Sequence, residues 1–220
     1  MLYEESLWFK DIISRTINDG SLVLNIGSST KEFIELTQPY IKSNILDVLS
    51  AKNCVVKNID IKDSEGVDLV GDVMDVTFIK QLKELNASAI ICANLLEHLE
   101  DRKAFCNALT TILNKDTLLL VSVPFSFPYH EDPIDTLYRP SVNDLQNAFP
   151  KLKLVNGNIV HCGTFFQYIT QNLSAVGKLK IFIVACIKAP LAYFYDKQKY
   201  LNWIWYFKGI STSCVTFKIK

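Results

Sequence analysis

The sequence lacks the cysteine and histidine patterns that mark structural zinc sites and redox-active dithiols. Its six cysteines are scattered, no two of them form a Cys-x-x-Cys pair, and only three histidines occur in 220 residues. This spacing excludes a zinc finger and a thioredoxin-like motif. We interpret the cysteines as free thiols in a reducing compartment, which predicts a cytoplasmic protein.

Secretory signals and long apolar runs are also missing. Residues 1–13 are acidic and lack the basic segment and apolar stretch of a signal peptide. The run Ile181–Ile187 is far shorter than the ~20 residues that a membrane-spanning helix needs. The composition, 49% apolar and 21% charged, is that of a folded globular protein. We expect one domain over residues 1–220, in which 165–208 form a helical lid or insertion.

The net charge of zero hides an asymmetry between the two parts of the chain. Residues 1–150 contain 13 Lys and Arg against 22 Asp and Glu, whereas residues 151–220 contain 10 Lys and a single acid, Asp196. The last third therefore faces either an anionic partner or the acidic first part of the chain.

Short β-branched runs alternate with helical patterns, which predicts a parallel sheet flanked by helices. The expected helices cover about 3–18, 30–40, 76–85, 101–113 and 141–149, and two or more helices between 165 and 208 are interrupted by Pro190. The expected strands are 21–26, 53–59, 67–70, 88–93, 117–123, 152–160 and 213–219.

Small and polar residues follow several of these strands. Gly27, Ser28 and Ser29 separate the first strand from a helix, an arrangement that predicts free backbone N–H groups facing a ligand. A plain structural turn is the alternative. Asp60 follows the second strand, where a carboxylate can accept both hydroxyls of a ribose. Asp72 and Asn94 follow the next two strands and add further polar groups at the same edge.

The order of these segments resembles the class I S-adenosylmethionine-dependent methyltransferases. The stretches VLNIGSS, NIDI, LVGDVMDVTF and IICANLLEHLED match, in order, the family's glycine-rich loop, second-strand acid, adenine-contacting segment and fourth-strand signature. The resemblance implies a Rossmann-like doubly wound sheet of about seven strands with the last strand antiparallel. It also implies S-adenosylmethionine as cofactor, bound by Asn25, Gly27, Ser28, Ser29, Asp60, Ile61, Asp72, Val73, Asn94 and Leu95.

Two departures from the family pattern concern the cofactor loop. Asn25 stands where the family usually has an acid, and Ser28 and Ser29 replace further glycines. The uncharged Asn25 makes a weaker bond to an ammonium group, because charge-assisted hydrogen bonds are roughly twice as strong. Sugar-modifying members of the family share the NIGS form, so we interpret the loop as degenerate but functional.

The loop after the fifth strand is expected to hold the methyl acceptor. Its pattern Pro-x-His-x-x-Pro-x-Asp-x-x-x-Arg resembles a subset of the family associated with polysaccharide biosynthesis, which implies O-methylation of a sugar or another small polar acceptor. His130 is the candidate base or acceptor ligand, supported by Asp135 or Asp132. The expected acceptor contacts are Tyr129, Tyr138 and Arg139. Alternatively, these residues only anchor the loop.

A metal site is not expected. Glu97, Asp101 and a loop carboxylate or histidine offer hard-cation ligands, but no dense carboxylate cluster accompanies them. His98, in the Leu-Glu-His turn, is interpreted as an imidazole that packs near the cofactor without a chemical role.

The basic, aromatic segment 178–208 has two interpretations. Lysines interleaved with tryptophan, tyrosine and phenylalanine suit peripheral contact with an anionic membrane. A helical lid or a homodimer contact is favoured instead, and a nucleic-acid partner is not expected because arginines are too few. Two other functions stay open for the chain: a nicotinamide-dependent oxidoreductase and a non-catalytic scaffold or membrane-docking protein with the same fold.

Overall fold

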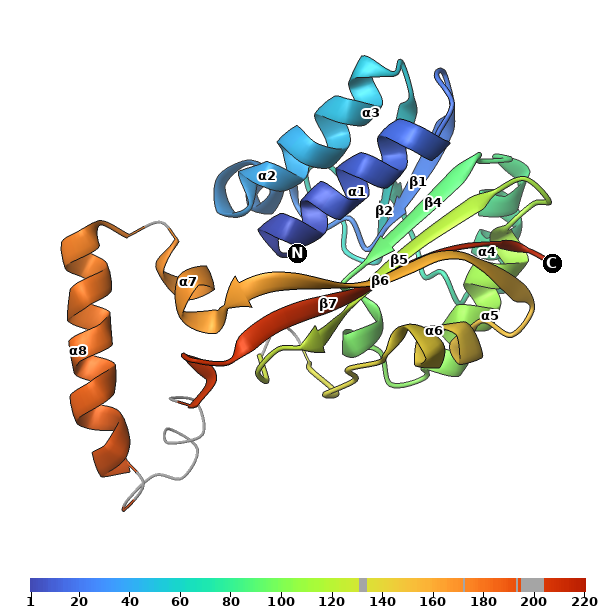
Figure 1. Ribbon diagram of the computed structural model, residues 1–220. Helices are drawn as coiled ribbons and strands as arrows, with labels where there is room; N and C mark the ends of the chain where they lie inside the picture. Colours follow the sequence, from blue (N-terminus) through green and yellow to red (C-terminus); the bar gives the residue numbers. More distant parts are fainter. Residues whose placement is uncertain (131–133, 172, 193, 195–203) are drawn as a thin grey trace.

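The protein forms a seven-stranded mixed sheet of strand order β3-β2-β1-β4-β5-β7-β6 with helices on both faces (Figure 1). This computed structural model describes residues 1–130, 134–171, 173–192, 194 and 204–220. The strands are β1 (Leu22–Ile26), β2 (Val55–Asp60), β3 (Leu69–Val70), β4 (Ala89–Ala93), β5 (Leu118–Ser126), β6 (Leu152–Thr164) and β7 (Gly209–Ile219).

The direction of the strands confirms the expected topology. Strands β1 to β5 pair in parallel, and β7 runs antiparallel to both β5 and β6. Each strand lies within a few residues of its expected position. The order reverses between β1 and β4, which is the place where open α/β sheets bind ligands beyond the carboxyl ends of their strands.

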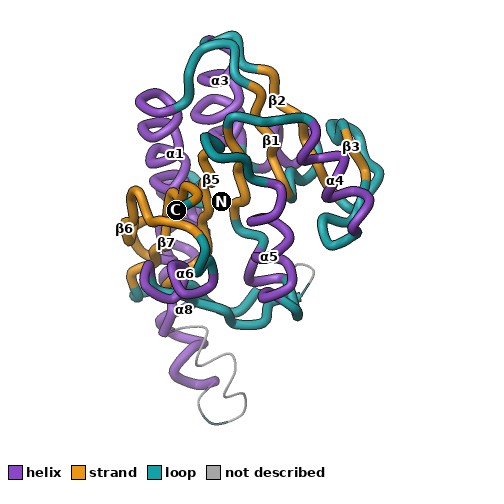
Figure 2. The backbone as a smooth tube through the Cα atoms, turned by 90° about the vertical axis from the view of Figure 1, so that its right-hand side faces the viewer, coloured by secondary structure: helices purple, strands orange, loops and turns teal. Residues whose placement is uncertain are grey.

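Two apolar clusters fill the two faces of the sheet. On one face, Phe9 and Ile13 of α1 (Tyr3–Thr16) pack with Val23 and with Leu49 of α3 (Asp47–Ala51). On the other face, the cluster joins β-strand residues to α4 (Val76–Glu84), α5 (Arg102–Ile112) and α6 (Val142–Ala148). Figure 2 shows the two helical layers on either side of the strands.

The helix expected over 30–40 is broken. A π-helical stretch, Phe33–Thr37, ends at Gln38, whose φ of −131° and ψ of 65° are not helical, and the short helix α2 (Pro39–Ile41) follows. Since the ring of Pro39 disfavours the α conformation in the preceding residue, the break is a local effect of proline. A second π-helical stretch, Lys42–Leu46, leads into α3, and this part of the helical layer was not predicted.

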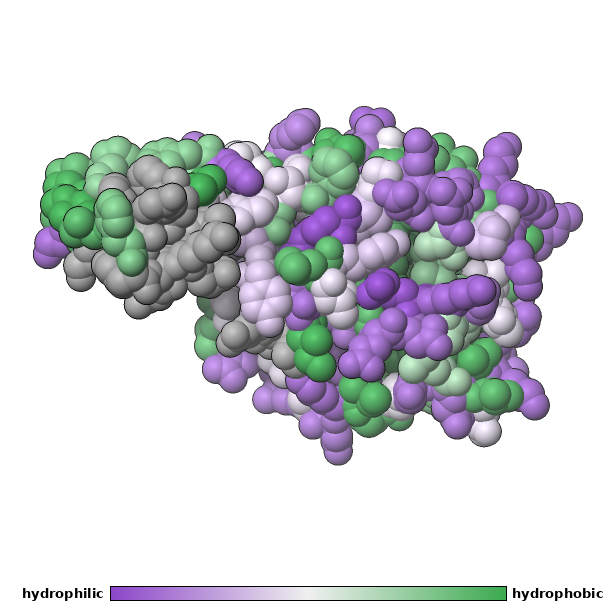
Figure 3. Space-filling model, turned by 90° about the horizontal axis from the view of Figure 1, so that it is seen from below, coloured by the Kyte–Doolittle hydropathy of each residue, from purple (hydrophilic) through white to green (hydrophobic). Residues whose placement is uncertain are grey.

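The C-terminal insertion consists of α7 (Phe165–Thr170) and α8 (Ala175–Ala192), and α8 stands apart from the sheet (Figure 1). The expectation that Pro190 interrupts a helix is wrong, because α8 continues through it. Val176, Leu179 and Ile187 are 57–65% exposed, and Figure 3 shows the hydrophobic side chains gathered over α8. None of the described helices is long and apolar enough to cross a membrane.

Candidate functional site

The expected site residues gather at one edge of the sheet. Because β1 to β5 are parallel, the residues that follow them share the edge formed by their carboxyl ends. The residues at this edge are Gly27, Ser28 and Ser29 after β1, Asp60 and Ile61 at the end of β2, Asp72 and Val73 after β3, Asn94 and Leu95 after β4, and Tyr129 and His130 after β5.

Position 27 requires glycine for two reasons, its backbone conformation and the closeness of a neighbouring side chain. Its φ of +72° lies in the left-handed region, and a Cβ there would be 2.9 Å from Cδ2 of Leu95, which follows β4. A side chain at this position would be strained and would collide with the adjacent loop. The close approach holds the β1 and β4 loops together at the point where the strand order reverses.

The N–H groups of this loop are engaged within the chain, contrary to the expectation that they are free. Those of Gly27 and Ser28 donate to the carbonyl oxygen of Ile59 at 2.9 and 3.3 Å, and that of Ser29 donates to Oδ2 of Asp60 at 3.3 Å. The loop is therefore shaped by the end of β2. Because these three N–H groups are engaged, the remaining capacity of the loop to bind a ligand lies in its side chains and carbonyl groups.

Asp60 and Asp72 each stabilise a turn at the edge. Oδ1 of Asp60 accepts a hydrogen bond of 3.0 Å from the N–H of Lys62, and Oδ1 of Asp72 accepts one of 2.8 Å from the N–H of Met74. A carboxylate oxygen has two acceptor sites, so both side chains keep capacity for the hydroxyl or amino groups of a ligand. Beside them, Ile61 is 66% exposed whereas Val73 is buried.

The two asparagines have different surroundings. Nδ2 of Asn25 donates to Oδ1 of Asn58 on the neighbouring strand at 3.0 Å. Asn94 has a φ of +50°, its N–H donates to the carbonyl oxygen of Ser122, and its Nδ2 donates to Oε1 of Glu5 at 2.8 Å. Asn94 therefore links the edge of the sheet to the first helix.

Glu5 is a residue at this edge that sequence reasoning missed. Its side chain is fully buried, and its carboxylate also accepts hydrogen bonds from the N–H of Leu2 at 2.9 Å and from Oγ of Ser122 at 2.6 Å. Thr212 Oγ1, on β7, lies 3.4 Å from Oε2. In the sequence Glu5 is one acid in the first turn of an amphipathic helix, where acids are usually solvated. Only the tertiary structure brings its donors together.

In the acceptor loop, Arg139 and Asp135 form a two-pronged ion pair. Nη1 and Nη2 of Arg139 donate to the two carboxylate oxygens of Asp135 at 3.0 and 2.5 Å, and the guanidinium also donates to the carbonyl oxygens of Phe127 and Pro128. Burial alone would raise the pKa of Asp135, but hydrogen bonds from Arg139 and from two backbone N–H groups lower that pKa to about 2. Asp135 is therefore ionised at neutral pH. Asp132 lies outside the described residues.

His130 lies beside this ion pair. Its Nδ1 is 3.0 Å from Oδ2 of Asp135, without the alignment of a hydrogen bond. Burial lowers the pKa of His130, and the nearby Asp135 offsets part of that shift; a lowered pKa favours the neutral imidazole. Tyr129 is 51% exposed. Tyr138 packs against Arg102, whose Cζ lies over the tyrosine ring at 4.5 Å from the ring centroid.

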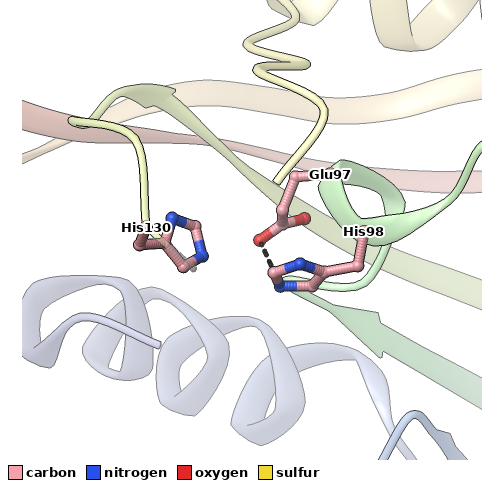
Figure 4. A group of neighbouring side chains, drawn as sticks. All are labelled: Glu97, His98 and His130. Atoms are coloured by element: carbon pink, nitrogen blue, oxygen red, sulfur yellow. Dashed lines mark ion pairs between the residues drawn. The ribbon is translucent and has the colours of Figure 1, made fainter. Parts of the chain in front are cut away.

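Glu97 and His98 meet His130 across the edge of the sheet. From the sequence, Glu97 is grouped with Asp101 and a loop carboxylate or histidine, but not with His98. Both belong to the 3-10 helix Leu96–His98, and the three side chains converge on one space (Figure 4). Glu97 is 1% exposed, and its burial raises its pKa to about 8. Nδ1 of His98 lies 2.7 Å from the carbonyl oxygen of Ile134 and therefore donates the hydrogen bond between them, which leaves Nε2 as an acceptor.

Two surface hollows lie away from this edge. One is lined by residues of α1 and α3 and includes Ser14 and Lys52, and the other lies between α5 and α6 and includes Asn107 and Asn147. Neither contains an expected cofactor or acceptor residue. The candidate site is therefore defined by the loops and side chains at the carboxyl edge.

No protein-family model and no curated protein matches the sequence. Solved structures match its fold. Coclaurine N-methyltransferase bound to N-methylheliamine and SAH is 17% identical, with a TM-score of 0.54 over 98% of this chain and 71% of that one. The [4+2]-cyclase SpnF is 12% identical, with a TM-score of 0.58 over 97% and 81%.

A third match is the Burkholderia thailandensis 1,6-didemethyltoxoflavin-N1-methyltransferase with bound 1,6-didemethyltoxoflavin and S-adenosylhomocysteine. It is 10% identical, with a TM-score of 0.55 over 99% of this chain and 79% of that one. These likenesses confirm that the chain has the class I methyltransferase fold.

Proposed function

We propose that the protein is an S-adenosylmethionine-dependent methyltransferase that methylates an oxygen of a sugar or of another small polar acceptor. One observation carries the proposal: the four family-like segments lie side by side at the carboxyl edge of a sheet whose strand order is that of the class. Two solved structures with this fold carry the demethylated cofactor, by their descriptions. A third is a cyclase, so the fold alone does not dictate the chemistry.

The residues at the edge fit the cofactor. Asp60, with spare acceptor capacity at the end of β2, would hold the ribose hydroxyls, and Asp72 would accept from the adenine amino group. Asn25 and the Gly27 loop would face the amino-acid part, with Asn94 and Leu95 lining it. When bound, the cofactor supplies an electrophilic methyl group for in-line transfer.

We assign the acceptor a position beside His130. A hydroxyl acceptor must lose a proton as it takes the methyl group, and the neutral His130 imidazole can accept that proton. Asp135 lies next to Nδ1 and favours the imidazolium that forms. The sequence predicts that Arg139 contacts the acceptor. Because its guanidinium already donates to Asp135 and to loop carbonyl groups, we propose instead that Arg139 positions Asp135.

Calorimetric titration with S-adenosylhomocysteine and, separately, with NADH tests the proposal. We expect micromolar binding of S-adenosylhomocysteine only, lost in Gly27→Val because of its positive φ and its contact with Leu95. Gly20→Val is the matched control, since Gly20 has the same φ of +72° and nothing within 4 Å of an added Cβ. Binding of NADH alone would establish the oxidoreductase instead. No heat from folded protein with either ligand would favour the non-catalytic scaffold.

Helix α8 is the candidate contact surface for a larger partner. Its exposed apolar residues are accompanied by the exposed Lys178 and Lys180, a combination that suits an anionic membrane surface. A second copy of the chain is the alternative partner, and the rest of the segment 178–208 lies partly outside the described residues.

A further inference from the structure

Three potential metal ligands converge at the carboxyl edge of the sheet. One ligand atom each from Glu97, His98 and His130 lie within 4.8 Å of one another, and Oε1 of Glu97 is 3.8 Å from Nε2 of His98. Figure 4 shows the three side chains pointing toward a common space, two from the 3-10 helix after β4 and one from the loop after β5. We infer that they form a binding site for one divalent transition-metal ion such as Zn²⁺.

One polar atom in this cluster lacks a partner. Among the described residues, Oε2 of Glu97 is buried without a hydrogen bond, and the Glu97 side chain is only 1% exposed. Nδ1 of His130 faces Asp135 at 3.0 Å, which leaves Nε2 of His130 for the cluster. Burying an unpaired polar oxygen is costly, so buried polar groups usually have a hydrogen-bond partner, and buried charges are paired or coordinate a metal. A cation bound by Glu97 would supply such a partner.

The surrounding hydrogen bonds orient the ligands as they do in metal sites. The carbonyl oxygen of Glu97 accepts from both the N–H and Oγ1 of Thr136, at 2.9 and 2.8 Å, which holds the 3-10 helix against the acceptor loop. The bond between Nδ1 of His98 and the Ile134 carbonyl oxygen fixes the ring and presents its Nε2. A carbonyl partner of this kind is the usual second contact of a metal-bound histidine.

The donor set selects the class of metal. Two imidazoles and one carboxylate suit Zn²⁺ and its first-row neighbours better than Mg²⁺ or Ca²⁺, which prefer oxygen ligands alone. Around a tetrahedral ion with bond lengths of about 2.0–2.2 Å, two ligand atoms lie about 3.3–3.6 Å apart, so ligand atoms up to 4.8 Å apart must approach one another by about 1 Å to bind one ion. Three protein ligands leave at least one coordination position open.

The cluster includes His130, the residue beside which the acceptor is proposed to lie. The role of the metal there rests on the proposed function: it would bind the acceptor oxygen and favour its deprotonation, in which case His130 is a ligand and not the base. Metal binding itself does not depend on that function. It is measured with Zn²⁺ alone, in the absence of any cofactor, so the two proposals can fail separately.

Native protein is treated with a chelator, without unfolding, and is then titrated with Zn²⁺ by calorimetry. The absorption spectrum of the Co²⁺-substituted protein reports the ligand geometry. We expect one Zn²⁺ per chain, at least about tenfold weaker binding in Glu97→Gln and in His130→Gln, and a metal-induced rise in melting temperature that these variants lose. His161→Gln is the matched control, because His161 is the third histidine and lies exposed on β6.

The control separates the site from surface binding. Unchanged affinity in His161→Gln together with loss in Glu97→Gln and His130→Gln supports the inference. Circular dichroism verifies folding, and if the buried Glu97→Gln does not fold, the partly exposed His130→Gln decides alone. The inference is overturned if Zn²⁺ does not bind stoichiometrically, if His161→Gln loses binding, or if His130→Gln keeps full affinity.

Discussion

Oε1 of Glu5, on the first helix, accepts a hydrogen bond of 2.8 Å from Nδ2 of Asn94, at the end of β4. The same carboxylate accepts from Leu2 and Ser122, so one buried side chain fixes the conformation of Asn94 and the entry of α1 onto the sheet. In each hydrogen bond of this carboxylate among the described residues, the partner is the donor.

Glu5→Gln should therefore destabilise the fold. Glutamine has nearly the same shape, but its NH₂ group would face donors, and each unsatisfied buried polar group costs about 1–3 kcal/mol. We expect urea unfolding to show a decrease of that size in the free energy of unfolding. Glu4→Gln, at the exposed neighbouring position, should leave stability within about 0.5 kcal/mol of the wild type. Equal effects of the two substitutions would contradict this role of Glu5.

If Asp60 holds the ribose of the cofactor, Asp60→Ala should weaken S-adenosylhomocysteine binding by about 1.5–3 kcal/mol, the range for hydrogen bonds to a charged group. Calorimetry on the folded variant measures the change. Asp63→Ala, an exposed acid just beyond the same strand, is the control and should bind as the wild type does. Unchanged affinity in Asp60→Ala would remove Asp60 from the site.

Arg139→Lys should loosen the acceptor loop. Lysine keeps the charge but cannot reach both oxygens of Asp135 and the carbonyl groups of Phe127 and Pro128 at once. We expect a loss of about 1–3 kcal/mol in the free energy of unfolding. Arg15→Lys is the comparison, because the Arg15–Asp11 pair is exposed and surface pairs contribute about 0–1 kcal/mol. A loss no larger than that of Arg15→Lys would show that the loop does not depend on the forked geometry.

The N-terminus of α6 should give a pH-dependent contribution to stability. Hydrogen bonds from the side chain and N–H of Ser141 lower the pKa of Asp144 below its ordinary 3.8. A depressed folded-state pKa stabilises the protein above the unfolded value, and that contribution is lost as the pH falls through the folded value. Asp144→Asn should thus melt below the wild type at pH 7, and the difference should shrink in acid below about pH 3.8. A difference that is independent of pH would rule out this linkage.

The apolar surface of α8 should be detectable in a sedimentation experiment. Wild-type protein is expected to co-sediment with anionic vesicles at low salt and to be released as salt screens Lys178 and Lys180. Ile187→Glu should abolish the association, whereas Leu36→Glu, at a 76% exposed position elsewhere, should not. Protein that stays in the supernatant but is dimeric by light scattering, and monomeric in Ile187→Glu, would assign the helix to self-association.

Much of the sheet could be predicted from the sequence because its strands carry strong local signals. Buried runs such as Ile90–Cys92 and Leu118–Val121 are apolar on both faces, as central parallel strands must be. The broken helix near Gln38 was missed, although Pro39 gave the signal for it. The residues at the carboxyl edge were predicted because strand ends locate them without any knowledge of packing.

The side-chain clusters could not be predicted in the same way. Glu5 finds its partners just after β4, on β5 and in the N-terminal turn, and Glu97 meets His130 only because β4 and β5 are neighbours. A sequence window shows neither contact. The free energy that orders these groups comes from tertiary burial, so their geometry appears only once the sheet is assembled.

The position of β7 has a kinetic consequence. This late segment lies between β5 and β6, and its Thr212 approaches Glu5 near the other end of the chain. Until residues 209–219 have been synthesised, β5 keeps an unpaired edge and the buried carboxylate lacks part of its surroundings. Such long-range pairing gives a high contact order and slow folding. A nascent chain therefore exposes this unpaired edge from the synthesis of β5 until that of β7, and chaperone binding would protect the chain from aggregation during that interval.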